Sequence, residues 1–137
     1  MQTVREAMVP EPGTIEASAS ATEAGETLKR PEVRAVLVTD DGTLVGVITR
    51  KTLVREVVAA GRDPNTTTLG EIAEKPHHTI DPSVELDNAF AFLEEHDLER
   101  VPVVEDGKLV GVLSRAVIQR RLAEDEPPPE TELIEEA

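Results

Sequence analysis

The sequence contains two closely related stretches, DDGTLVGVITR at residues 40–50 and EDGKLVGVLSR at residues 105–115. They lie 65 residues apart, and the same offset aligns residues 1–57 with residues 66–122 without a gap. Of these 57 positions 17 are identical, against roughly four expected by chance from ordinary composition. Such a period indicates an internal duplication. We therefore predict a first repeat at 1–65, a second at 66–123, and a separate acidic, proline-rich tail at 124–137.

Each repeat has the pattern of strand, helix, strand, strand, helix. The two quoted stretches begin with Asp-Gly pairs flanked by β-branched runs, which is the turn chemistry of tight hairpins. The paired runs are 34–39 with 44–49, and 100–104 with 109–113. After the hairpins, Thr49 and Ser114 are placed as N-caps of helices at 50–60, ending at Gly61, and at 115–123. Both hairpins and both following helices are expected.

The helix between the first two strands is clearer in the second repeat. There Ser83 is the candidate N-cap, and one face carries Leu86, Ala89, Phe90 and Leu93. In the first repeat the same positions hold small residues and one leucine, namely Ala21, Ala24, Gly25 and Leu28. This thinner face is either an oligomer contact or a weakly filled part of the monomer core.

Composition excludes several classes of protein. The 137 residues suit a single domain of moderate size. The formal net charge of −14 disfavours nucleic acid as a partner, and half of it lies in the tail, which holds seven acids and three consecutive prolines. The chain has no cysteine, and no apolar run long enough to span a membrane or act as a signal peptide. We expect a cytoplasmic protein with a solvated tail.

The sequence resembles the cystathionine β-synthase (CBS) domain family, whose members occur as tandem pairs called Bateman modules. The resemblance covers about residues 1–123. It rests on the duplication, on RVPVV (100–104) before Asp106-Gly107, and on GVITRKT (46–52) with GVLSRAV (111–117). It implies a mixed α+β fold of two βαββα repeats related by pseudo-twofold symmetry, with their sheets packed together and helices flanking them. It further implies a homodimer and inter-repeat clefts that bind adenosine nucleotides.

The resemblance also implies a set of ligand-contacting positions. These candidates are Thr14, Gly46, Thr49, Arg50, Lys51, Thr52, His78, Arg100, Val101, Pro102, Gly111, Ser114 and Arg115. From the residues alone, a glycine within a strand indicates close approach of a ligand or another backbone, or a β-bulge. Helix starts with nearby cations suit phosphate, but capping alone also explains Thr49 and Ser114.

One feature departs from the family pattern. Nucleotide-binding members end the Gly-apolar-x-Thr/Ser-x-x-Asp/Asn motif with a residue that grips the ribose hydroxyls, and this chain has Thr52 and Val117 there. The first repeat also has Leu37 where the second has Pro102. Because Thr52 keeps a hydroxyl and Val117 has none, the first repeat is the better candidate for ribose binding.

Metal binding and catalysis find little support in the sequence. His77 and His78 are adjacent, and neighbours on a strand point to opposite faces, so we expect no metal site and place one histidine at the cleft. No Ser/His/Asp context or phosphate-binding glycine loop is present, so we do not expect an enzyme. Two functions remain. One is a stand-alone sensor that binds AMP, ADP, ATP or S-adenosylmethionine and signals to an unknown effector; the other is a ligand-free dimeric scaffold.

Overall fold

The computed structural model describes residues 2–124. The predicted tail, apart from Glu124, lies outside these residues. Both predicted hairpins are confirmed: β3 (Val36–Asp40) pairs with β4 (Thr43–Ile48), and β5 (Arg100–Glu105) with β6 (Lys108–Ser114). In each turn the Asp and the Gly have positive φ, 50° and 82° in the first and 52° and 81° in the second. This left-handed geometry is why Asp-Gly occupies both turns.

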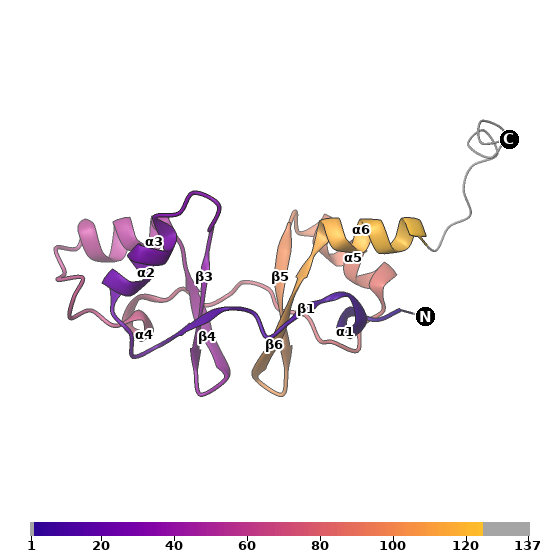
Figure 1. Cartoon of the computed structure of the whole chain (residues 1–137), viewed down its shortest axis with the longest axis horizontal. Helices are drawn as coiled ribbons and strands as arrows, with labels where there is room; N and C mark the ends of the chain where they lie inside the picture. The colour runs from indigo at the N-terminus through magenta and orange to yellow at the C-terminus, as the bar shows by residue number, and fades with distance from the viewer. Residues whose placement is uncertain (1, 125–137) are drawn as a thin grey trace, which may run out of the picture.

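The strands of the described residues form one six-stranded sheet (Figure 1). The short strand β2 (Thr14–Glu16) runs parallel to β3, and β1 (Val9–Pro10) runs antiparallel to β6. The two hairpins meet only at their turns, where Thr43 pairs with Lys108. The expected first strand of the second repeat is reduced to a single bridge between Ile80 and Val103.

Helices lie at both ends of this arrangement (Figure 1). The first repeat has α2 (Ala21–Leu28) and α3 (Arg50–Leu53), which continues as the π-helix η1 (Val54–Val58). The second repeat has α5 (Leu86–Glu95) and α6 (Arg115–Glu124). Two shorter helices, α1 (Val4–Ala7) and α4 (Leu69–Ile72), lie at the start of the first and the second repeat. No described helix is long and apolar enough to cross a membrane.

The predicted N-caps of α3 and α6 are confirmed, and that of α5 is wrong. Thr49 accepts a hydrogen bond from the amide of Thr52, and Ser114 accepts one from the amide of Val117. Ser83 lies before the helix, whose N-cap is Glu85. The amide and the hydroxyl of Ser83 instead donate to Asp81 Oδ1, and these bonds hold the pKa of Asp81 below its usual value. Asp81 thus forms an Asx turn with Ser83, and the local sequence pattern does not distinguish such a turn from a helix cap.

The hydrophobic core of each repeat contains a short helix that belongs to the other repeat in the sequence. Val4 and Ala7 of α1 are buried among the second-repeat residues, while Leu69 and Ile72 of α4 are buried among those of the first. Equivalent backbone bonds fix both exchanges: Leu86 N donates to Gln2 O, and Ala21 N donates to Thr67 O. The packing units are therefore interleaved along the chain and related by pseudo-twofold symmetry.

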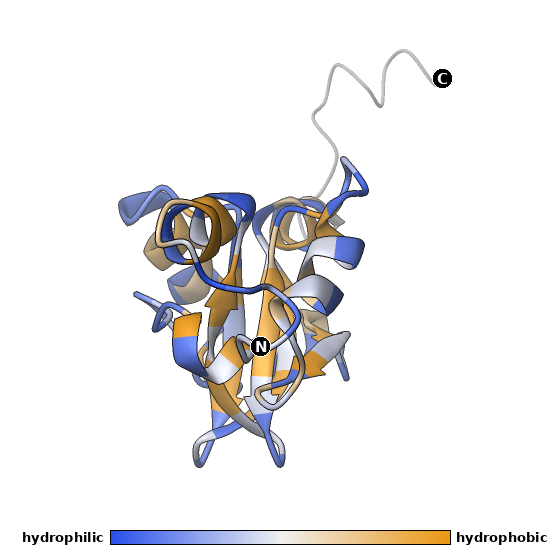
Figure 2. Ribbon diagram, turned by 90° about the vertical axis from the view of Figure 1, so that its left-hand side faces the viewer, coloured by the Kyte–Doolittle hydropathy of each residue, from blue (hydrophilic) through white to orange (hydrophobic). Residues whose placement is uncertain are grey.

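The thin face of α2 belongs to the monomer core at three of its four positions. Ala21, Ala24 and Leu28 are at most 2% exposed, whereas Gly25 is half-buried. Figure 2 shows hydrophobic residues concentrated in the strands and hydrophilic ones at the hairpin turns. The mixed α+β fold of paired repeats is thus present as predicted.

Candidate functional site

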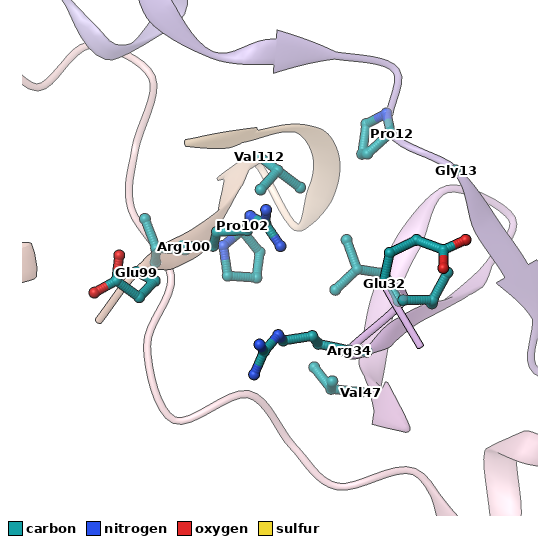
Figure 3. Close-up of a pocket in the computed structure, with 13 residues that line it drawn as sticks. Pro12, Gly13, Glu32, Arg34, Val47, Glu99, Arg100, Pro102 and Val112 are labelled. Carbon is teal, nitrogen blue, oxygen red and sulfur yellow. The ribbon is translucent and has the colours of Figure 1, made fainter. Parts of the chain in front are cut away.

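The candidate site is a cleft of about 530 Å³ between the two hairpins. Its walls use equivalent positions of the two repeats, so that Leu37 and Val47 face Pro102 and Val112 across the pseudo-twofold axis. In Figure 3, Val47 lies on one side and Pro102 and Val112 on the other, with Pro12 and Gly13 at the upper right of the view. The remaining lining residues are Glu32, Val33, Arg34, Ala35, Glu99, Arg100 and Val101. A mostly apolar cleft with a few charged groups is typical of a small-molecule site.

The charges of the cleft include one arginine from each repeat, Arg34 and Arg100. Glu32 and Glu99 also line it, yet among residues 2–124 neither guanidinium forms an ion pair or a hydrogen bond within the chain. Glu99 instead lies 3.8 Å from Arg115 Nη1. The two cleft arginines therefore retain their full donor capacity for an anionic ligand.

Three of the residues proposed from the sequence, Arg100, Val101 and Pro102, line this cleft. Thr14 lies on β2 beside it, paired with Leu37 and exposed. The other candidates are absent from its lining.

The two strand glycines are explained by another backbone. A Cβ on Gly46 would lie 2.6 Å from the carbonyl oxygen of Glu74, and one on Gly111 would lie 2.8 Å from that of Val9. Bulges also occur beside both glycines, where the register shifts between Val38 and Thr39 and between residues 103 and 104. The crossing segment, β1 in one half and residues 73–74 in the other, leaves no room for a side chain.

The start of α3 carries a hydrogen-bonded network. Thr49 and Thr52 form a capping box, and the Thr52 hydroxyl donates to Glu74 Oε1 at 3.2 Å. Arg55 Nη2 donates to the same oxygen. Thr52 is fully buried. Its hydroxyl is therefore committed to the protein rather than directed into open solvent.

The remaining cations are divided between structural contacts and solvent. Arg50 Nη2 donates to the carbonyl of Arg30 at 2.8 Å, and Lys51 is exposed. Arg115 lies 3.8 Å from both Asp97 and Glu99, and its Nη1 is buried without a hydrogen-bond partner among the described residues. Ser114 serves as the cap of α6.

His78 belongs to a ring cluster of the second repeat. Its ring centroid lies 4.2 Å from that of His96 and 5.6 Å from that of Phe92. His77 is exposed. Within residues 2–124, no group of three or more His, Asp or Glu side chains is arranged to hold a metal ion.

A second hollow of about 530 Å³ lies on the first repeat between α2 and the α3–η1 segment. Gly25 lines it at the position that Phe90 occupies in the second repeat. Val58 of η1, another lining residue, is 73% exposed, and the neighbouring Val54 is 57% exposed. This hollow is an apolar groove at the surface.

Sequence reasoning missed two charged residues, Arg34 and Glu74. Arg34 lies one position before the alignment partner of Arg100, which is Ala35, so the repeat alignment does not single it out. Glu74 is brought to α3 by the backbone pairing of the start of the second repeat with Val47 of β4, which no local sequence pattern predicts. The available signal was the 65-residue offset itself, which relates Glu74 to Val9.

Two duplicated α+β units around a shared axial cleft define a tandem-repeat module. The CBS domain model matches residues 4–59 and again 69–124. The chain therefore belongs to the CBS domain family and contains a tandem pair.

Relatives of known structure share this architecture. Hypoxic response protein 1 of Mycobacterium tuberculosis is 35% identical over 104 residues, which cover 75% of this chain and 73% of that protein. The crystal structure of Hypoxic Response Protein I with two coordinated zinc ions has a TM-score of 0.74 at 30% identity, covering 88% of this chain and 99% of that chain. The structure of CBSX2 in complex with AMP has a TM-score of 0.71 at 27% identity, covering 90% and 98%.

Proposed function

We propose that this protein is a CBS-pair regulator that binds an adenosine nucleotide in the axial cleft and relays its occupancy to an effector protein. The proposal is carried by the guanidinium groups of Arg34 and Arg100, which have no partner among residues 2–124 and lie on an otherwise mostly apolar cleft formed by both repeats. The apolar walls suit a base, and the guanidinium groups suit phosphate. The AMP complex of CBSX2 supports this class of ligand.

The affinity is expected to be modest. Thr52 and Val117 provide no carboxylate at the motif positions that grip ribose in the family. We expect a Kd on the order of 10 μM to 1 mM, which corresponds to about −7 to −4 kcal/mol. AMP, ADP and ATP are the first ligands to test, with S-adenosylmethionine as a ligand that carries no phosphate.

Isothermal titration calorimetry of the parent and three variants tests this proposal. Arg34→Met and Arg100→Met should each weaken AMP binding about 10-fold or more, because each removes a charge-assisted hydrogen bond. Lys51→Met is the matched control, since Lys51 is a cation named by the motif but exposed and absent from the cleft. Adenosine should bind all four proteins alike. Absence of heat with every nucleotide at millimolar concentration would reject the sensor.

The groove at Gly25 favours a second role, as the contact between two copies of the chain. One side of the groove is lined by Leu53, Val57 and Val58. They belong to the segment 50–59, which carries three bases and one acid, whereas residues 86–97 of the second repeat carry four acids and no lysine or arginine. This complementarity favours an antiparallel homodimer, in which the first repeat of one copy contacts the second repeat of the other. A dimer built this way is also the core of the alternative scaffold function.

Light scattering and crosslinking test the dimer. Gly25→Phe fills the groove and should yield monomers. In the control Gly25→Ala the new Cβ has one ordinary contact, with Leu53 Cδ1 at 4.0 Å, so this variant should remain dimeric. Because the chain has no cysteine, Val58→Cys reports orientation directly. It should not crosslink to itself in an antiparallel dimer, and it should do so in a parallel one. A parent mass of one chain at tens of micromolar contradicts the proposal.

A further inference from the structure

Glu74 lies at the end of a row of residues that crosses the sheet of the first repeat. Leu37 pairs with Val47, and Val47 pairs with Glu74 through two backbone hydrogen bonds of 2.8 and 3.0 Å. Directly paired residues of antiparallel strands present their side chains on the same face. Leu37 and Val47 both line the axial cleft. The side chain of Glu74 therefore emerges on the same face of the sheet, next to Val47 and outside the residues that line the cleft itself.

Only one of the two carboxylate oxygens of Glu74 is engaged. Oε1 accepts hydrogen bonds from the Thr52 hydroxyl, at 3.2 Å, and from Arg55 Nη2. Oε2 has no hydrogen-bond partner among the described residues. The side chain is 42% exposed. The carboxylate is thus held in place through one oxygen, while the other is accessible to an incoming donor.

The second repeat lacks the hydroxyl and the carboxylate of this arrangement, although Arg120 stands at the position equivalent to Arg55. The partner of Val112 across the sheet is Val9, which stands where Glu74 stands in the first repeat. The residue equivalent to Thr52 is Val117. The hydroxyl and the carboxylate therefore occur together in one half and are replaced together by valines in the other. A role confined to the general architecture would not require this difference, because both halves fold alike.

We propose that Glu74 Oε2 is the acceptor for the ribose hydroxyls of the bound nucleotide, so that a carboxylate from the start of the second repeat replaces the one missing at position 52. This inference rests on the proposed nucleotide function and names the subsite within it. Thr52 and Arg55 position the carboxylate, and its free oxygen accepts from the sugar. The ribose then lies beside the first repeat, and the site binds one nucleotide per chain.

A double-mutant-type cycle, in which both the protein and the nucleotide are varied, tests the proposed contact between Glu74 and the ribose. The titrations use AMP and 2′-deoxy-AMP against the parent, Glu74→Gln and the matched control Glu71→Gln. Glu71 is also an exposed acid with an arginine partner, Arg62 at 3.6 Å. The parent and Glu71→Gln should prefer AMP about 10- to 100-fold, the range for a hydrogen bond to a charged group. In Glu74→Gln the preference should fall below about 3-fold.

A rescue variant keeps the test independent of any effect on folding. Adding Thr52→Asp to Glu74→Gln returns a carboxylate to the motif position and should restore the preference for AMP. Equal discrimination by the parent and Glu74→Gln overturns the assignment even if AMP binds well, as does a double variant that folds but shows no restored preference. A parent that binds neither nucleotide rejects the proposed function itself, and the ribose contact with it.

Discussion

Gly46→Ala should destabilise the protein strongly, because the crossing backbone occupies the space that its side chain needs. The new Cβ would lie 2.6 Å from the Glu74 carbonyl oxygen and 2.8 Å from Ala73 Cβ. Overpacking of this kind costs about 1–3 kcal/mol. Moving the segment away would also break the two backbone hydrogen bonds between Val47 and Glu74, each worth about 0.5–1.5 kcal/mol. We expect a loss of about 2–6 kcal/mol in the free energy of unfolding.

Urea denaturation followed by far-ultraviolet circular dichroism measures this loss, since the chain has no tryptophan or tyrosine for fluorescence. Gly25→Ala is the control. Its Cβ meets only Leu53 Cδ1 at 4.0 Å, and replacing a helical glycine should stabilise the protein by about 0.5–1 kcal/mol. The two substitutions should therefore have opposite signs. A loss below about 1 kcal/mol at Gly46 would refute the steric reasoning.

Three further outcomes follow from the structure and the sequence. Val9→Glu with Val117→Thr should raise the stoichiometry of AMP binding from one to two per chain, as calorimetry can measure, because it copies the polar pair of the first repeat into the second; an unchanged stoichiometry contradicts the pairing argument. Ser83→Ala should raise the pKa of Asp81 toward its usual value in an NMR titration, because the largest cause of the lowered pKa is lost. Since that pKa is depressed on folding, Asp81 stabilises the parent above its usual pKa and loses this contribution as pH falls through the folded value; a pKa unchanged by the substitution would show that the hydroxyl contributes nothing. Deleting residues 124–137 should leave thermal unfolding unchanged while the net charge falls from −14 to −7, and a loss of several kcal/mol would mean that the tail packs on the domain.

The local features of the fold were predictable because short-range chemistry specifies them. Asp-Gly turns require positive φ, and hydroxyl residues at the ends of β4 and β6 cap the next helix, so both hairpins and both following helices follow from the sequence. The exchange of α1 and α4 between the two cores does not follow from the sequence. The repeats align at the 65-residue offset whether the first helix of a repeat packs in its own core or in the other one, and only tertiary packing distinguishes the two arrangements.

The candidate site divides in the same way. Arg100 and Pro102 belong to a recognisable motif and lie in the cleft. His78 was placed at the cleft from its position in the chain, yet the structure directs it to Phe92 and His96. The role we propose for Glu74 depends on its backbone pairing with Val47, 27 residues earlier in the chain. Residue types alone do not reveal that these two segments pair.

The interleaved cores give the loop between η1 and α4 an unusual property. Residues 58–66 are exposed, and a protease that cut there would produce two fragments, each carrying a helix that completes the other's core. Val4 and Ala7 would remain buried in the second fragment's core, and Leu69 and Ile72 in that of the first. The nicked protein should hold together without its covalent link. The same loop is therefore a natural point at which to divide the chain into a split reporter, whose halves reassemble because neither can bury its apolar surface alone.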